Sequence, residues 1–113
     1  MRVYIAGALS SKEKVNRSPS QIIVDYIQNV HTMCQTASKV RRMGHEPYVP
    51  GLDLLLGIIA GDWEEEEYRG LGMSFLSVCD AVLVTSWSWG VEQEVEYAKE
   101  LGIPIFYSEE ELG

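Results

Sequence analysis

The chain has 113 residues with 17 acidic and 9 basic side chains, and its formal net charge is −8 at pH 7. This charge argues against binding to a nucleic acid polymer or to an anionic membrane, because both require a basic surface. The length and the hydrophobic fraction of 46% indicate one domain, residues 1–113, with a hydrophobic core of its own.

Cysteine usage and hydropathy point to a protein of the reducing cytoplasm. Cys34 and Cys79 are far apart and in no paired spacing, which argues against a disulfide framework or a zinc site. No window approaches the roughly 20 apolar residues of a membrane span. The apolar segment after Met1 is also too short for a signal peptide. We therefore expect buried thiols, no metal and no membrane partner.

Four short apolar runs, each typical of a strand, alternate with three segments of helical periodicity. In chain order, the predicted elements are a strand at 2–6, a helix at 21–43, a strand at 45–50, a helix at 63–78, a strand at 80–85, a helix at 91–101 and a strand at 103–107. The first helix has the clearest boundaries. Ser18, Pro19 and Gln21 match the N-cap, N1 and N3 positions of a capping box, and Gly44 follows two arginines at the other end.

Alternation of strand and helix predicts the fold class. We expect an α/β protein, a small Rossmann-like, doubly wound three-layer sandwich with a parallel sheet of four to five strands. Ligands of such folds bind outside the carboxyl ends of the strands. The segments expected at that edge are the loops 7–20, 50–62 and 86–90.

The third of these loops leads into the acidic helix predicted at 91–101, whose start lies in the segment "SWGVEQEVEYAKE" at 88–100. Gly90 has no side chain, so a ligand can approach its backbone closely. Glu92, Glu94 and Glu96 cannot all point the same way, because successive helical residues rotate by about 100°. Spacing alone does not show which one faces the cleft. A carboxylate near a helix N-terminus fits a nucleophile, and it equally fits a solvated helix start.

The first loop contains neither a dinucleotide-binding G-x-G-x-x-G nor a P-loop motif. It contains Ser10 and Ser11, followed by three cationic side chains: Lys12, Lys14 and Arg17. Hydroxyl groups and cations together can hold one phosphate, or they can form a plain solvated loop. Trp87 and Trp89 leave two interpretations open as well, because they can stack on a ring ligand or pack in the core.

Four segments of the chain resemble the nucleoside 2-deoxyribosyltransferase superfamily. They are "YIAG" in the first strand, "GHEPYVPG" after the first helix, "CDAVLV" in the central strand, and "SWGVEQEVEYAKELGIPI" at the end. The similarity spans nearly the whole chain and is greatest to small 2′-deoxynucleoside 5′-phosphate N-hydrolases. Its most specific part is S-x-G-V-x-x-E-x-x-x-A, which begins at Ser88 and includes Gly90 and Glu94.

The resemblance implies cleavage of the N-glycosidic bond of a (deoxy)nucleoside or its 5′-monophosphate, by hydrolysis or by base transfer and without a cofactor. It implies that Glu94 is the nucleophile that attacks C1′ of the sugar. The other site residues it implies all bind substrate: Tyr4, Gly7, Ser10, Ser11, Ser88 and Gly90. Members of this family often form dimers, so a homodimer or higher homo-oligomer is expected too.

One position departs from the family pattern. The family carries an aspartate, which handles the base, eight residues before the aspartate of the "CDAV" segment. The corresponding residue here is Gly72. Asp62 or one of the glutamates at 64–67 is a candidate substitute from the same segment. The departure keeps a second hypothesis open, a non-catalytic nucleotide-binding or sensor module on the same fold.

Overall fold

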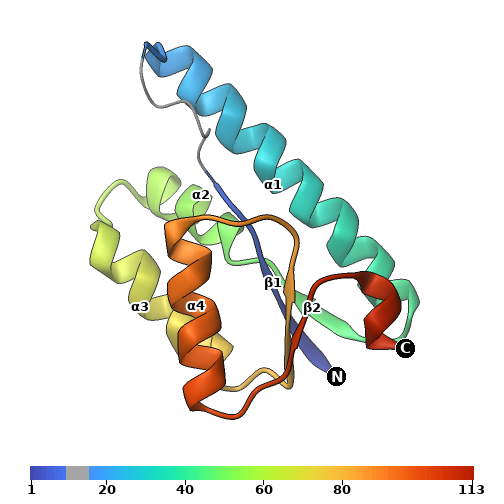
Figure 1. Cartoon of the computed structure of the whole chain (residues 1–113). Coiled ribbons are helices and arrows are strands. Elements are labelled where there is room, and N and C mark those ends of the chain that lie inside the picture. Colours follow the sequence, from blue (N-terminus) through green and yellow to red (C-terminus); the bar gives the residue numbers. More distant parts are fainter. Residues whose placement is uncertain (10–15) are drawn as a thin grey trace.

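The computed structural model describes residues 1–9 and 16–113 and confirms the α/β fold (Figure 1). Four parallel strands form one sheet in the order β2-β1-β3-β4. The strands are β1 (Arg2–Ala6), β2 (Glu46–Tyr48), β3 (Ala81–Val84) and β4 (Ile105–Phe106). The helices are α1 (Pro19–Arg42), α2 (Gly51–Ala60), α3 (Glu65–Leu76), α4 (Trp89–Glu100) and the short 3-10 helix η1 (Glu109–Leu112).

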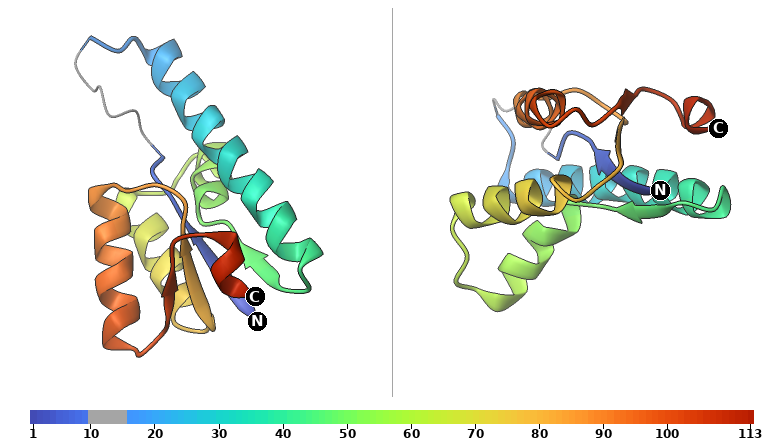
Figure 2. Two further views of the ribbon diagram at one scale, coloured as in Figure 1. Left: turned by 45° about the vertical axis from the view of Figure 1, so that its right-hand side comes forward. Right: turned by 90° about the horizontal axis from the view of Figure 1, so that it is seen from below.

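Helices cover both faces of the sheet, as expected for parallel strands. Figure 2 shows the strands between α1 and α4. Alternate residues of β1 and β3 point to opposite faces. Val3 and Ile5 pack with Met33 of α1, whereas Tyr4 and Ala6 pack on the side of α3 and α4. Two core clusters therefore stabilise the sheet, one on each face.

The order in which the strands are added to the sheet reverses between β1 and β3, which makes this position the switch point of the sheet. The chain goes from β1 through α1 to β2 on one side, then returns to pair β3 with the other edge of β1. Tyr4 lies opposite Tyr48 of β2 and Val82 of β3. A switch point of this kind leaves a crevice outside the carboxyl ends of the strands, because the connecting helices leave in opposite directions.

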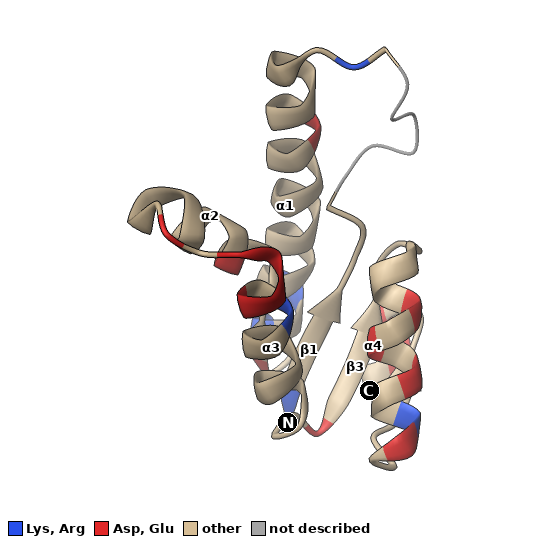
Figure 3. Cartoon of the chain, turned by 90° about the vertical axis from the view of Figure 1, so that its left-hand side faces the viewer, with Lys and Arg blue, Asp and Glu red and all other residues tan. Residues whose placement is uncertain are grey.

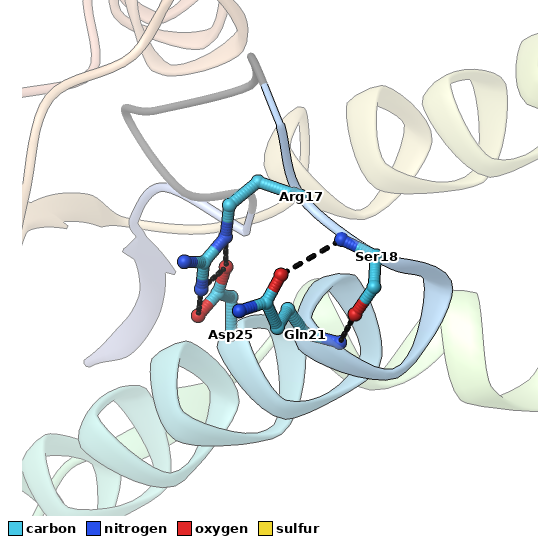
Figure 4. Close-up of polar contacts among 4 residues, drawn as sticks. All are labelled: Arg17, Ser18, Gln21 and Asp25. Carbon is cyan, nitrogen blue, oxygen red and sulfur yellow. Dashed lines mark hydrogen bonds and ion pairs between the residues drawn. The ribbon is translucent and has the colours of Figure 1, made fainter.

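Helix α1 begins as its sequence predicts. The Ser18 hydroxyl accepts a hydrogen bond from the backbone N–H of Gln21, and the Gln21 side chain accepts one from the N–H of Ser18 (Figure 4). Arg17 adds an ion pair with Asp25 at 2.6 Å. The C-terminal half of α1 packs on the sheet. The N-terminal half extends beyond it (Figure 1), so that its large aliphatic side chains are exposed.

Helix α2 is not in the sequence-based prediction, which treats residues 50–62 as a loop. The structure corrects this: residues Gly51–Ala60 form an α-helix that ends at Gly61, whose φ of 82° lies in the left-handed region that favours glycine. The segment lacks helical periodicity because leucine and isoleucine occur all around it. Only a narrow face with Gly51 and Gly57 is buried. No helix in the described residues is long and apolar enough to cross a membrane.

Packing of α2 against α3 can be tested by two glycine substitutions with opposite expected effects. Gly57 is buried, and a Cβ atom there would overlap the ring of Tyr68 in α3. We expect Gly57→Ala to lower the free energy of unfolding by about 1–2 kcal/mol, although alanine normally favours a helix. Gly70 of α3 has open space around it, so Gly70→Ala should raise this free energy by up to about 1 kcal/mol. Chemical denaturation measures both. Stabilisation by both variants would contradict the packing described.

Candidate functional site

A pocket of about 380 Å³ opens at the switch point between β1 and β3. Its wall comes from the end of β1, the start of α2, the inner side of α3 and the first turns of α4. The lining residues are Tyr4, Leu9, Pro50, Leu54, Glu65, Tyr68, Arg69, Gly72, Met73, Gly90, Gln93 and Glu94. The wall is mostly apolar with a few polar groups that converge, which is the usual form of a small-molecule site.

Helix α4 directs one of its glutamates into this pocket. Glu92 and Glu96 are exposed on the outer side of the helix, whereas Glu94 is partly buried and lines the pocket. The helix begins at Ser88, whose hydroxyl accepts a hydrogen bond from the N–H of Val91. Val91 and Val95 lie buried against the sheet. This fixes the rotation of α4, and rotation of about 100° per residue then brings Glu94 to the pocket side.

The Glu94 carboxyl lies in an environment that disfavours its charge. Its Oε2 atom is buried and has no hydrogen-bond partner among residues 1–9 and 16–113. Burial raises the pKa of this carboxyl to about 7, and the Tyr4 hydroxyl and the positive charge of Arg69 oppose the rise. An unpartnered carboxylate oxygen is costly in a fold. Such a group that titrates near neutral pH is typical of a functional site.

Tyr4 belongs to a row of polar and aromatic side chains. The sequence analysis predicted Tyr4 as a site residue and did not predict the others. Its ring lies 5.6 Å from that of Tyr48, which stacks on Phe75 at 4.7 Å. The Tyr48 hydroxyl donates a hydrogen bond to Asp53 of α2. Burial raises the pKa of both tyrosines and of Asp53. For Tyr4, burial is the largest cause of the raised pKa and the nearby Glu94 carboxyl is the next, so its hydroxyl is a hydrogen-bond donor in the pocket.

Gly72 lies in this pocket, opposite the first strand. A Cβ atom at this position would come 3.2 Å from the Tyr4 hydroxyl. Among the candidate substitutes for a carboxylate here, only Glu65 lines the pocket. Asp62 is exposed, and Glu64 and Glu67 form the capping box of α3. A side chain at position 72 would therefore lie in tight contact with the Tyr4 hydroxyl.

Arg69, one turn before Gly72, is the cationic side chain that lines the described pocket. Its guanidinium donates hydrogen bonds to Glu65 at 2.9 Å and to Gln93 at 3.0 Å. It also lies over the ring of Trp89, 4.7 Å from the centroid. These contacts join α3 to α4 across the pocket. The acidic side chains of the chain gather on α3 and α4, the two helices that face each other across the pocket (Figure 3). The side chains of Trp87 and Trp89 are exposed and take no part in the core.

Three of the predicted site residues line the pocket, and Ser88 and Gly7 have structural roles next to it. Tyr4, Gly90 and Glu94 line the pocket. Ser88 caps α4. Gly7 allows close packing, since a Cβ atom there would come 2.5 Å from Thr85 Oγ1 and 2.8 Å from Met33 Sδ. The predicted phosphate-binding residues Ser10 and Ser11 lie outside the described residues.

Residues that sequence reasoning missed are Tyr48, Asp53, Arg69 and Gln93. Asp53 was not predicted as a site residue, because the segment 51–60 that contains it has no helical periodicity. The feature that could have indicated a helix there is the apolar run of ten residues at 51–60, between Pro50 and Gly61. Its length suits a buried or packed helix. Arg69 had a weaker signal. It is the sole cation between residues 45 and 98.

Comparison of the chain with models of known protein families, with curated proteins and with solved structures finds no match. The resemblance to deoxyribosyltransferases therefore depends on the motifs quoted above, and the pocket is an independent guide to function. Within residues 1–9 and 16–113, no three His, Cys, Asp or Glu side chains are placed to hold a metal ion.

The raised pKa of Glu94 predicts a pH-dependent stability. Between pH 4.5, the ordinary value of this carboxyl, and about 7, the folded state holds a proton that the unfolded state has released. Stability therefore falls as pH rises through this range, by at most about 3 kcal/mol. We expect Glu94→Gln to match the native chain below pH 4.5 and to exceed its stability above pH 7.

Urea denaturation at both ends of this range measures the effect. Glu96→Gln is the matched control, because Glu96 is exposed on the same helix. Its difference from the native chain should not change with pH across the range. An equal pH dependence in the two variants would show that the Glu94 carboxyl is not desolvated.

Proposed function

We propose that the chain cleaves the N-glycosidic bond of a (deoxy)nucleoside or its 5′-monophosphate, with Glu94 as the nucleophile. The observation that carries the proposal is the Glu94 carboxyl itself, buried at the switch-point pocket with one oxygen unpartnered. The motif resemblance selects the same residue among the glutamates of α4. These two lines of support are independent, since one comes from sequence spacing and the other from burial.

The chemistry of this bond fits the pocket. Loss of the base builds oxocarbenium-like positive charge on the sugar, and a nearby carboxylate stabilises this charge and forms a covalent bond to C1′. Water then releases the sugar, or a second base accepts it. A carboxylate that is poorly solvated in the empty pocket is a better nucleophile than one surrounded by water. Tyr4 would orient the attacking carboxyl by hydrogen bonding.

A 5′-phosphate would lie toward the start of α4. The backbone N–H of Gly90 lies in the first turn of α4, where N–H groups have no partner within the helix and attract an anion. In this proposal Ser10 and Ser11 add hydroxyl donors from the first loop. The Ala8 N–H donates a hydrogen bond to Ser86 Oγ at 2.8 Å, so the start of that loop is joined to the loop that precedes α4.

A second candidate function is a non-catalytic nucleotide-binding module. The observation in its favour is Gly72, which leaves no carboxyl group where a proton donor for the base is expected. A binding module would show a thermal shift with nucleotides, because a ligand that binds only the folded state stabilises it. It would release no base from any of them.

Base release separates the two functions. A panel of ribo- and deoxyribonucleosides and their 5′-monophosphates is incubated with the protein, and free base is measured by chromatography. We expect release from at least one compound, and loss of at least about a thousandfold in kcat for Glu94→Gln, since the covalent step needs a carboxylate.

The control is Glu96→Gln, which keeps the fold and removes an exposed carboxylate from the same helix. It should retain native activity. Release that persists unchanged in folded Glu94→Gln would exclude this nucleophile. No release by the native chain, together with a nucleotide-dependent thermal shift, would favour the binding module.

A further inference from the structure

The pocket holds a fixed positive charge where a proton donor is absent. Arg69 lines the same wall as Gly72 and lies near enough to Glu94 to lower the pKa of its carboxyl. Within the described residues, two of its five N–H groups are bound, one by Glu65 and one by Gln93. The remaining donors are available to a ligand. The Trp89 ring beneath the guanidinium adds a third restraint on its position.

Neither neighbouring carboxylate fits the role of acid. Glu65 is 77% exposed and holds Arg69 in an ion pair, a role that uses its ionised form. Asp53 bonds to the Tyr48 hydroxyl and does not line the pocket, so it cannot reach a bound base. Arginine itself does not give up its proton near neutral pH. It can, however, stabilise negative charge as it forms.

We propose that Arg69 replaces the general acid and also determines which base is cleaved from the sugar. This inference rests on the glycosidase function proposed above. The Arg69 guanidinium stabilises the departing base as an anion. The planar guanidinium, which can donate two hydrogen bonds side by side, favours bases with two adjacent acceptors. Guanine and hypoxanthine present such a pair, O6 and N7. Adenine presents an amino donor at the same edge, which opposes a guanidinium.

The step balances without an acid. A Glu94 oxygen forms a bond to C1′ while the C1′–N bond breaks, and the electron pair of that bond stays on the ring nitrogen. Arg69 holds the resulting anion by hydrogen bonds to its acceptor edge. One water then supplies its hydroxyl to C1′, which releases the Glu94 carboxylate, and its proton to the base.

The test compares leaving groups. kcat/KM is measured for the deoxynucleotides of guanine, hypoxanthine and adenine, and for a 4-nitrophenyl deoxyriboside, whose leaving group is a stable anion without help. We expect the native chain to prefer 6-oxopurines. Arg69→Met should lower kcat/KM for these by about a hundredfold or more, and that for the nitrophenyl compound by less than about tenfold.

Two further readouts separate this role from a structural one. Added guanidinium ion should restore 6-oxopurine cleavage to Arg69→Ala. The native pH profile of kcat/KM should rise with the ionisation of Glu94 and show no descending limb below about pH 9, because no acid has to stay protonated. Arg42→Met is the control, since Arg42 lies exposed in the last turn of α1, far from the pocket along the chain.

The outcomes distinguish this inference from the function on which it depends. Equal losses for all leaving groups in Arg69→Met, or a bell-shaped native profile in that range, would overturn the role of Arg69 and leave the glycosidase in place. No release of base or nitrophenol by the folded native chain would overturn both.

Discussion

The candidate site depends on the parallel pairing of β1 with β3. This pairing brings the start and the later part of the chain to one edge of the sheet, with Tyr4 opposite Val82. Everything at the pocket follows from it, because the loop after β3 then leads α4 across the end of β1. The two strands carry the most buried side chains of the molecule, so the geometry of this edge is held by both core clusters. Catalytic groups placed on such a frame move little relative to each other.

The negative charge of Glu94 at this edge is only partly compensated by its neighbours. Burial removes water from the Glu94 carboxyl, and Tyr4 and Arg69 only partly compensate for this loss of solvation. The pKa of the carboxyl therefore rises to about 7. A fold selected for stability alone would place a leucine there, because an unpaired buried carboxyl is destabilising. Local destabilisation of this kind is typical of functional sites, where stability and activity compete. The positive charge developing on a sugar ring is a partner that would relieve it.

Helix α2 has a different role on each side. Its narrow inner face closes the pocket through Leu54 and supports Tyr48 through Asp53. Its outer face exposes leucines and isoleucines next to the uncovered half of α1. A chain of 113 residues buries a smaller share of its apolar surface than a larger one. The exposed aliphatic side chains of α2 are part of the apolar surface that remains uncovered.

Several features could be predicted from the sequence because each depends on local chemistry. The strands, the caps of α1 and the order of elements follow from apolar periodicity and from residues such as Ser18 and Gly44. Candidate nucleophiles could be narrowed to the glutamates of α4. The motif resemblance selected Glu94 among them, and the structure places that side chain in the pocket.

Other features were decided only by the tertiary structure. The sequence did not show α2, because a helix that is apolar all around has no periodicity to detect. It also did not show that Asp53, Tyr48 and Tyr4 form one row, or that Arg69 reaches the pocket from α3 to contact α4. These contacts join segments that are far apart along the chain. The physical reason is that burial, and with it the pKa of a carboxyl, depends on which elements pack together, whereas periodicity and capping depend on neighbours in sequence.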